Sequence, residues 1–394
     1  MTKQSIAVVG PMNAQRLIPA LDLVPHESAE VAAVGHGGHP VTELVLAMQR
    51  TVERLVLVTL QPGLRSPLVY ENGAGVRLHI GPYRERARDR ARDFFRTERA
   101  YIEQVLSMER PRSVSAHWTY EYALGALQAD PRTLVTVHDW APEILRFAPD
   151  PYRACRLAMQ GWAFAKGRHF AGVSPYITHR VQRYARRSCV LLPNGLADEW
   201  FLAQPAERRA DSLRFVAVNS GFDARKNVGT LLEAWRLVQQ VSPQAQLLLV
   251  GEGYEPTGAA QRWAAQRRLT QQVEFHGPVD RRGLAALLST ATAFVHPSRE
   301  ESFGMVILEA MAQRVPVIAG ADSGAVPWLL RNGAGLLTDV RSPAALASSI
   351  LAVADSPELR AGLRDRASRR AREFSISTVA DDYLQHLRLI RDGS

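Results

Sequence analysis

The sequence predicts an α/β protein made of two domains, each built on a parallel sheet. Short apolar runs alternate with stretches of helical periodicity along most of the chain, which is the pattern of repeated strand–helix units. The chain has 394 residues, enough for two domains of ordinary size. A polar, charged stretch at 204–211 is typical of a linker. We therefore expect one domain over residues 1–205 and a second over 206–373.

The composition is that of a soluble globular chain, with 46% hydrophobic and 22% charged residues. No apolar run is long enough to cross a bilayer, and the first residues enter a predicted strand without the anatomy of a signal peptide. Cys155 and Cys189 form no metal motif, so we expect free thiols in a reducing cytoplasm. The net charge of +9 indicates an anionic partner, with nucleic acid, anionic lipid and nucleotide-sugar all open.

In the first domain the predicted strands are 5–10, 55–59, 76–80, 112–118, 133–137 and 170–174. Residues 13–30 have no strong period, and we expect an irregular insertion there. Gly37 and Gly38 belong to a glycine cluster that precedes an amphipathic stretch at 41–50. Such a cluster lets a ligand approach the backbone at a helix N-terminus, although a plain turn is an equal alternative.

The most charge-dense stretch is 84–99, in which seven arginines alternate with four acidic residues. The interleaved signs favour a solvated helix with ion pairs between residues four apart. The alternative is a basic face that docks on anionic lipid.

Two predicted strands end in histidines, His117 and His138. In an open parallel sheet, residues just past the carboxyl ends of strands face the ligand crevice. Trp118 and Glu121 follow His117, and an aromatic ring beside a carboxylate suits the face and hydroxyls of a sugar. Packing is the alternative role for both.

In the second domain the predicted strands are 213–218, 247–250, 273–277, 291–295 and 315–318. Arg225 and Lys226 follow the first of these strands and precede a predicted helix at 228–238. A basic pair in such a loop is a candidate clamp for a diphosphate.

The most informative stretch is 296–320, which has the pattern of a strand end, a tight loop, a helix and a second buried strand. The loop ends at Gly304, where N–H groups at the helix N-terminus can hold an anion. Glu301 lies in the loop and Glu309 lies about two turns into the helix. Carboxylates beside an anion site suit a ligand with both hydroxyls and phosphates. Ordinary solvated carboxylates are the alternative.

This stretch resembles the E-x7-E signature of glycosyltransferase family four, retaining enzymes of the GT-B fold. Glu301 and Glu309 have its spacing, and the pattern P-S-x-x-E-S-F-G-x-x-x-x-E-A-M-A-x-x-x-P-V-I is matched nearly throughout. Arg314 and Val315 replace the usual Gly before the final Pro. The resemblance covers nearly the whole chain, strongly from 190 onward and loosely before 110. It implies two Rossmann-like domains facing across a cleft, with a C-terminal helix over 374–394 crossing back to the first domain.

The resemblance also implies roles for particular residues. His138 matches a T-x-H motif at the junction of donor and acceptor, and Val279 follows a segment similar to F-x-G-x-V, which contacts the nucleotide base. Lys226 matches the Lys of a G-R-L-x-x-x-K loop, whereas Gly221 stands at the position of its Arg. The implied catalytic residues are His138, Glu301 and Lys226; the implied donor-binding residues are Arg225, Lys226, Val279, Glu301, Ser302, Phe303, Gly304, Met305, Val306 and Glu309; the implied donor–acceptor loop is Gly37 and Gly38; and the acceptor candidates are His117, Trp118 and Glu121.

The expected function is retaining transfer of a hexosyl group from a nucleotide-diphosphate sugar to a glycan or lipid-linked acceptor. No D-x-D stands in a plausible loop, so we expect no metal and no other cofactor. A catalytically silent sugar-nucleotide-binding subunit is the main alternative. A nucleic-acid partner is disfavoured because no aromatic-basic stripe is present, and the E-x7-E loop argues against an epimerase or a phosphorylase. We expect a cytoplasmic protein, with peripheral contact to an anionic membrane as an open alternative.

Overall fold

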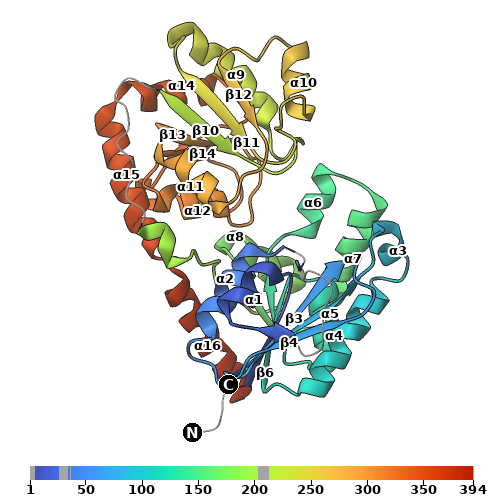
Figure 1. The fold of residues 1–394 in the computed structure, drawn as a ribbon. Helices are drawn as coiled ribbons and strands as arrows, with labels where there is room; N and C mark the ends of the chain where they lie inside the picture. Colours follow the sequence, from blue (N-terminus) through green and yellow to red (C-terminus); the bar gives the residue numbers. More distant parts are fainter. Residues whose placement is uncertain (1–4, 26–33, 36, 203–212, 394) are drawn as a thin grey trace. The chain divides into compact units, whose positions relative to one another are not determined.

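The computed structural model describes residues 5–25, 34–35, 37–202 and 213–393 (Figure 1). The chain divides into two compact units by its internal packing. The first unit comprises residues 1–195 and 376–394, and the second comprises 196–375. The linker expected at 204–211 lies outside the described residues, and the described residues on either side of it belong to the second unit.

The described part of the first unit contains a nine-stranded sheet in the order β2-β4-β5-β3-β1-β6-β7-β8-β9. The strands from β5 to β9 in this order are parallel, as expected, whereas β4 pairs antiparallel with both β5 and β2. The strands are β1 (Ser5–Val9), β2 (Val24–Pro25), β3 (Arg54–Pro62), β4 (Leu68–Glu71), β5 (Val76–Tyr83), β6 (Ser113–His117), β7 (Leu134–Val137), β8 (His169–Gly172) and β9 (Cys189–Leu191).

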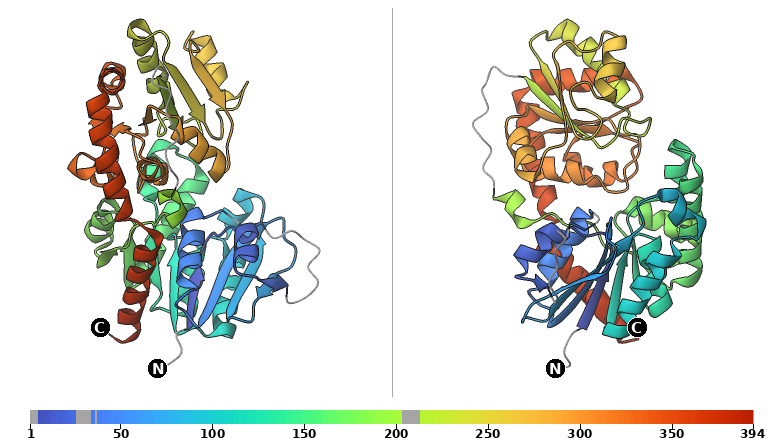
Figure 2. Two further views of the ribbon diagram at one scale, coloured as in Figure 1. Left: turned by 60° about the vertical axis from the view of Figure 1, so that its left-hand side comes forward. Right: turned by 45° about the vertical axis from the view of Figure 1, so that its right-hand side comes forward.

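Helices cover this sheet, and the last helix of the chain is one of them. α16 follows the second unit in sequence but packs against α2 and β6 of the first unit, as Figure 2 shows. The helices are α1 (Ala14–Ala20), α2 (His39–Met48), α3 (Ala87–Arg92), α4 (Arg96–Glu109), α5 (Glu121–Ala129), α6 (Ala141–Phe147), α7 (Pro151–Lys166), α8 (Pro175–Arg180, continued by a π-helical turn Val181–Ala185) and α16 (Ile376–Arg391).

A helix lies where we predicted an irregular insertion. Asn13 caps α1, because its side chain accepts a hydrogen bond of 3.0 Å from the Arg16 amide. The helix has only seven residues and contains Pro19, so its apolar period is too short to detect in the sequence. Leu17 nevertheless points into the core. The prediction was therefore wrong for 14–20, and its last residues, 26–30, lie outside the described ranges.

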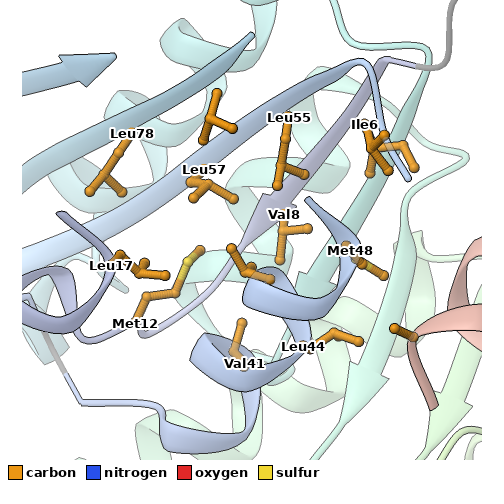
Figure 3. Close-up of a cluster of buried hydrophobic side chains, with 14 of the residues drawn as sticks. Ile6, Val8, Met12, Leu17, Val41, Leu44, Met48, Leu55, Leu57 and Leu78 are labelled. Carbon is orange, nitrogen blue, oxygen red and sulfur yellow. The ribbon is translucent and has the colours of Figure 1, made fainter. Parts of the chain in front are cut away.

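Apolar side chains from β1, β3 and β5 meet those of α1 and α2 in the core of the first unit (Figure 3). Burial of these side chains holds the two helices against the sheet. The labelled members are Ile6, Val8, Met12, Leu17, Val41, Leu44, Met48, Leu55, Leu57 and Leu78.

The second unit has a parallel sheet in the order β12-β11-β10-β13-β14-β15. Its strands are β10 (Arg214–Val218), β11 (Gln246–Val250), β12 (Val273–His276), β13 (Ala293–His296), β14 (Val317–Gly320) and β15 (Leu336–Thr338). Its helices are α9 (Val228–Val241), α10 (Ala259–Gln266), α11 (Arg281–Ser289), α12 (Met305–Ala312), α13 (Val326–Leu329), α14 (Pro343–Asp355) and α15 (Pro357–Arg372), with short 3-10 turns at Asp198–Phe201 and Arg331–Gly333.

Among the parallel strands of each described sheet, the direction of the strand order reverses at one point. In the first unit this point lies between β1 and β6, and in the second it lies between β10 and β13. Ligands of open α/β sheets bind outside the carboxyl ends of the strands at such a point. The loops after these four strands are therefore the places to look for a site.

None of the helices in the described part of the chain is both long and apolar enough to span a membrane.

Candidate functional site

In the second unit, Lys226 and Glu301 meet at the reversal point. Lys226 comes from the loop after β10 and Glu301 from the loop after β13, and Lys226 Nζ lies 2.8 Å from Glu301 Oε1. His296, the last residue of β13, places its Nε2 3.1 Å from the same oxygen. The structure thus brings together two residues that were each predicted from the sequence as site residues. It also places His296, which was not predicted, beside them.

Glu301 is ionised at neutral pH in this arrangement. Burial alone would raise its pKa, but the Lys226 charge and the hydrogen bond from His296 together hold the pKa of Glu301 well below its usual range. The side chains of Lys226 and Glu301 are only 12% and 14% exposed, so water screens the pair little. A fixed carboxylate of this kind is a strong acceptor for hydroxyl groups.

The loop that carries Glu301 is fixed by hydrogen bonds to its backbone. Asn227 Nδ2 donates to Pro297 O at 3.0 Å, and Ser323 Oγ donates to Ser298 O at 2.6 Å. The Ala325 amide donates to Glu301 O at 2.8 Å. Gly324 permits this approach, because it has a φ of +65° and a Cβ there would lie 2.4 Å from Glu301 O.

These supporting residues were not identified from the sequence. Asn227 and Ser323 act on backbone groups that are far from them along the chain, and no short motif records such contacts. Gly324 lies in a turn whose partner is the distant Glu301 loop. Asn227 at the start of α9 was the one detectable signal, because Asn is favoured at helix N-termini.

Arg225 is the second cation of the loop after β10. It pairs with Glu300, the residue that precedes Glu301. Its guanidinium lies 3.7 Å from Glu300, and Ser302 Oγ donates to Glu300 Oε1 at 3.4 Å. The Arg299 amide also donates to Arg225 O at 2.8 Å. Two ion pairs and a backbone hydrogen bond therefore join the loop after β10 to the loop after β13.

The helix α12 starts at this loop with a left-handed Gly304, whose φ is 97° and ψ is 58°. Gly304 has no side chain to cap the N–H groups of the first turn, which include those of Met305 and Val306. Glu309 is buried further along the same helix. The Phe303 ring packs against the rings of Trp328 and Phe374, with centroids 6.1 and 5.7 Å away. Only the backbone of Phe303 is therefore available to a ligand.

Val279 lies apart from these residues. It follows β12, which is separated from β10 by β11, and its side chain is half-buried.

In the first unit, His117 ends β6 and His138 follows the adjacent strand β7, and the two side chains contact each other. His117 Nδ1 lies 2.9 Å from His138 Nε2. The Trp118 ring stacks on His138 at 4.1 Å between centroids, and Tyr383 of α16 stacks on His117 at 5.8 Å. Trp118 has a φ of +65°, a conformation that costs a bulky residue energy and turns the chain sharply after β6.

Both histidines are neutral at neutral pH. Burial lowers the pKa of His117 to about 3, and burial together with the neighbouring His117 lowers the pKa of His138 well below its usual range. The separation of 2.9 Å between the two nitrogens requires one ring to donate and the other to accept. His138 is the more accessible ring, with 9% of its surface exposed against 1% for His117.

Glu121, predicted as an acceptor residue, is already engaged inside the first unit. Arg156 donates to its Oε2 at 2.7 Å, and the Tyr83 hydroxyl donates to its Oε1 at 3.3 Å. The Arg156 guanidinium also lies 3.5 Å from the centroid of the Tyr120 ring. Arg156 gave no signal in the sequence, because its partner is 35 residues away.

The glycine loop lies at the start of α2. Gly38 is the left-handed N-cap residue, and a Cβ there would lie 1.7 Å from Pro11 O in the loop after β1. Gly37 also has a positive φ, but apart from its chain neighbours no atom of the described residues lies within 4 Å of its Cβ position. Gly38 is therefore required by close packing at the carboxyl end of β1, and Gly37 faces open space.

Residues 84–99 do not form the single solvated helix that we predicted. The chain breaks between α3 and α4, where Phe94 and Phe95 are left-handed. Arg84 makes a bidentate contact with Asp93, at 2.9 and 2.8 Å, and a further pair with the buried Glu98. Arg84 is thus neutralised within the stretch because the segment folds back on itself, which pairwise spacing along one helix does not anticipate.

Arg90 and Arg99 of this stretch are also buried. The Arg90 guanidinium lies 4.2 Å from the centroid of the Tyr83 ring, and that of Arg99 lies 4.5 Å from Trp162. The stretch is therefore not a continuous basic face.

Among the described residues, no three His, Cys, Asp or Glu side chains are grouped as metal ligands.

Comparison with known proteins connects the second unit to a family. Residues 202–373 match the family described as glycosyl transferases group 1. The chain is 36% identical over 138 residues to a D-inositol 3-phosphate glycosyltransferase of Streptomyces coelicolor, which is 34% of this chain and 30% of that protein. It is 33% identical over 165 residues to a phosphatidyl-myo-inositol mannosyltransferase of Mycobacterium leprae, 41% of this chain and 43% of that one. The match thus spans less than half the length of these relatives.

Two solved structures resemble the whole chain in fold. Sucrose-phosphate synthase from Thermosynechococcus elongatus aligns over 100% of both chains, with a TM-score of 0.79 and 24% identity. A UDP-forming α,α-trehalose-phosphate synthase from Burkholderia xenovorans, solved with glucose-6-phosphate, aligns over 98% of this chain and 100% of its own, with a TM-score of 0.71 and 14% identity. Residues 202–373 therefore match the group 1 glycosyl transferase family, and the whole chain has the GT-B fold of these two synthases.

Proposed function

We propose that this chain is a retaining glycosyltransferase that moves a hexosyl group from a nucleotide-diphosphate sugar to a glycan or lipid-linked acceptor without a metal ion. The observation that carries the proposal is the Lys226–Glu301 pair at the reversal point of the second sheet. It puts a cation for phosphate and a carboxylate for hydroxyls within one small volume.

Cleavage of a sugar–diphosphate bond builds negative charge on the leaving phosphates. Lys226, Arg225 and the first-turn amides of α12 would supply the positive field that stabilises this charge. Glu309 would hold the ribose of the donor, and Glu301 the hydroxyls of its sugar. Val279 would lie beside the base. A field made of cations and amides takes the place that a divalent ion occupies in metal-dependent transferases.

His138 would act as a neutral hydrogen-bonding group beside the donor sugar. Burial holds its pKa well below the usual range, so it would form such a hydrogen bond without carrying a positive charge. With no enzymic nucleophile assigned, we propose that the acceptor attacks from the face of the departing phosphate, which takes the acceptor proton. Retention of the anomeric configuration follows from this geometry.

The two inositol-lipid and inositol-phosphate relatives suggest where the acceptor class should be sought. The names of those two enzymes refer to inositol 3-phosphate and to phosphatidyl-myo-inositol. We propose an acceptor that carries an anionic group, either free or linked to a lipid.

A lipid-linked acceptor calls for contact with an anionic membrane, and residues 151–197 offer a surface for it. This stretch has eight arginines and lysines and no aspartate or glutamate. Its exposed cations, which we call the acid-free surface, are Lys166, Arg168, Arg183, Arg186 and Arg187. Arg187 connects the cations that follow α8 with those at the end of α7, because it donates to Phe164 O and Ala165 O. Tyr184, 65% exposed, lies among these cations.

The test is incubation with UDP-, GDP-, ADP- and TDP-sugars, with proton NMR of the sugar released or transferred. Slow release of nucleoside diphosphate, with the sugar first appearing in the anomeric form of the donor, supports a retaining transferase. Inversion would contradict the mechanism. Binding without any turnover, with or without acceptors, would favour a catalytically silent subunit.

A further inference from the structure

His296 has no part in the function proposed above, yet it is built into the site. It is the last residue of β13, it is 3% exposed, and its Nε2 lies 3.1 Å from Glu301 Oε1. Its ring stacks beside Phe294, with the centroids 5.9 Å apart and the planes at 26°. A buried imidazole that hydrogen-bonds to a site carboxylate must do so with a defined nitrogen.

The partner of Nε2 identifies which ring nitrogen carries the donor proton. An ionised carboxylate only accepts hydrogen bonds, so the Nε2 that lies 3.1 Å from Glu301 Oε1 carries an N–H and donates to it. His296 Nδ1 is buried and has no hydrogen-bond partner among the described residues, so Glu301 is the partner that fixes the ring.

The contacts of Glu301 fall on one of its two oxygens. Lys226 and His296 both address Oε1, and no described residue hydrogen-bonds to Oε2. The terminal torsion of a glutamate is broad, so a single contact leaves the carboxylate free to turn. Two donors from different loops fix its plane and leave Oε2 for a ligand.

We propose that His296 is a positioning residue that holds Glu301 Oε1 while Glu301 Oε2 accepts a hydroxyl of the donor sugar. This rests on the proposed function. When the donor diphosphate engages Lys226, the lysine is drawn toward the phosphates, and His296 becomes the protein group that keeps Glu301 oriented. Binding of the donor's sugar, and not of its nucleotide, then depends on His296.

The test compares two variants in the full chain. His296→Met keeps the length of the side chain without a donor, and His296→Gln restores an N–H at similar reach. The affinities for a nucleotide-sugar and for the matching nucleoside diphosphate are measured by calorimetry, together with kcat/KM. For His296→Met we expect roughly tenfold weaker nucleotide-sugar binding and lower kcat/KM, the scale of one hydrogen bond to a charged group, with nucleoside diphosphate binding unchanged. His296→Gln should recover most of the loss.

Equal weakening of both ligands, no weakening of either, or His296→Gln behaving like His296→Met would overturn the proposal. Glu301→Gln separates this proposal from the function itself. If Glu301→Gln reduces the preference for the nucleotide-sugar over the nucleoside diphosphate and His296→Met does not, only the proposed role of His296 is contradicted. If Glu301→Gln leaves that preference intact, the proposed contact between Glu301 and the sugar fails.

A second measurement does not depend on how a variant folds. Nitrogen-15 NMR of histidine in the wild type should show that His296 carries a proton on Nε2. A His296 ring whose Nε2 carries no proton would also overturn the proposal.

Discussion

Lys226 Nζ lies 2.8 Å from Glu301 Oε1, and this ion pair joins two loops whose residues are 75 positions apart in the chain. Each loop follows one of the two central strands, β10 and β13, that flank the reversal point. The pair therefore depends on the topology of the sheet as well as on two side chains. The proposed donor site is assembled around it.

Removing either Lys226 or Glu309 should lower transfer at least about a hundredfold in kcat/KM, the scale of losing a key electrostatic contact. Lys226→Ala removes the diphosphate cation, and Glu309→Ala removes the proposed ribose contact. Glu274→Ala is the matched control, because this glutamate belongs to the same unit and its side chain is 60% exposed. A folded Glu309→Ala or Lys226→Ala protein with near-normal turnover would remove the basis of the site assignment.

Activity should survive chelation. The predicted diphosphate clamp is made of Lys226, Arg225 and helix amides, so EDTA should change the transfer rate by less than about twofold. The assay is transfer before and after treatment, with magnesium or manganese added back. Activity that disappears with EDTA and returns with the metal would mean that the diphosphate is held by a cation.

Stability should fall as the pH is lowered below about 6.5, in part because of His117. Burial lowers its pKa to about 3, below the value of about 6.5 for an unfolded histidine, so the unfolded chain binds more protons between these values. Stability therefore rises with pH in this window, by up to about 1.4 kcal/mol per pH unit for one histidine.

Urea unfolding of the wild type and of His117→Gln at pH 7.5 and 5.5 measures this contribution. Other histidines with pKa values lowered by burial, such as His79 and His169, remain in the variant. The pH-dependent loss of stability should thus be smaller in His117→Gln but not abolished. An equal loss in both proteins would show that His117 is not held neutral.

If the acceptor is lipid-linked, the acid-free surface should bind anionic liposomes at low salt. Replacing Lys166, Arg168 and Arg186 with Gln should weaken binding by roughly a hundredfold, since each cation near the membrane contributes about 1 kcal/mol. Replacing Arg86, Arg88 and Arg92 with Gln removes the same charge from exposed positions in the stretch with interleaved acids, and is the matched control. The assay is cosedimentation at two salt concentrations.

Equal weakening by the two triple variants would show that only net charge matters. A wild-type protein that does not bind such liposomes at low salt would favour a soluble acceptor.

The fold was predictable, and donor-site candidates could be named, because their signals are local. The apolar strands at 213–218, 247–250 and 291–295 were each found within one or two residues of β10, β11 and β13. The spacing of Glu301 and Glu309 is a property of one loop and one helix, and Lys226 is fixed by its place after a strand.

What could not be predicted depends on contacts between residues that are distant in sequence. The His117 ring, which contacts His138, also stacks on Tyr383 of the last helix. Glu121 accepts a hydrogen bond from Arg156. The arginines at 84–99 were misjudged because left-handed residues at Phe94 and Phe95 turn one predicted helix into two, and Arg84 then pairs with Asp93 and Glu98. A pattern along one element does not report such folding back.

The most direct test of the proposed donor site is the thermal unfolding midpoint of the wild type and of Lys226→Ala across UDP-, GDP-, ADP- and TDP-sugars. A ligand that binds the native state raises the midpoint according to its affinity. We predict that at least one nucleotide-sugar raises the midpoint of the wild type, and that the increase is lost in Lys226→Ala. No stabilisation by any nucleotide-sugar, or equal stabilisation of both proteins, would contradict a donor site built on Lys226 and Glu301.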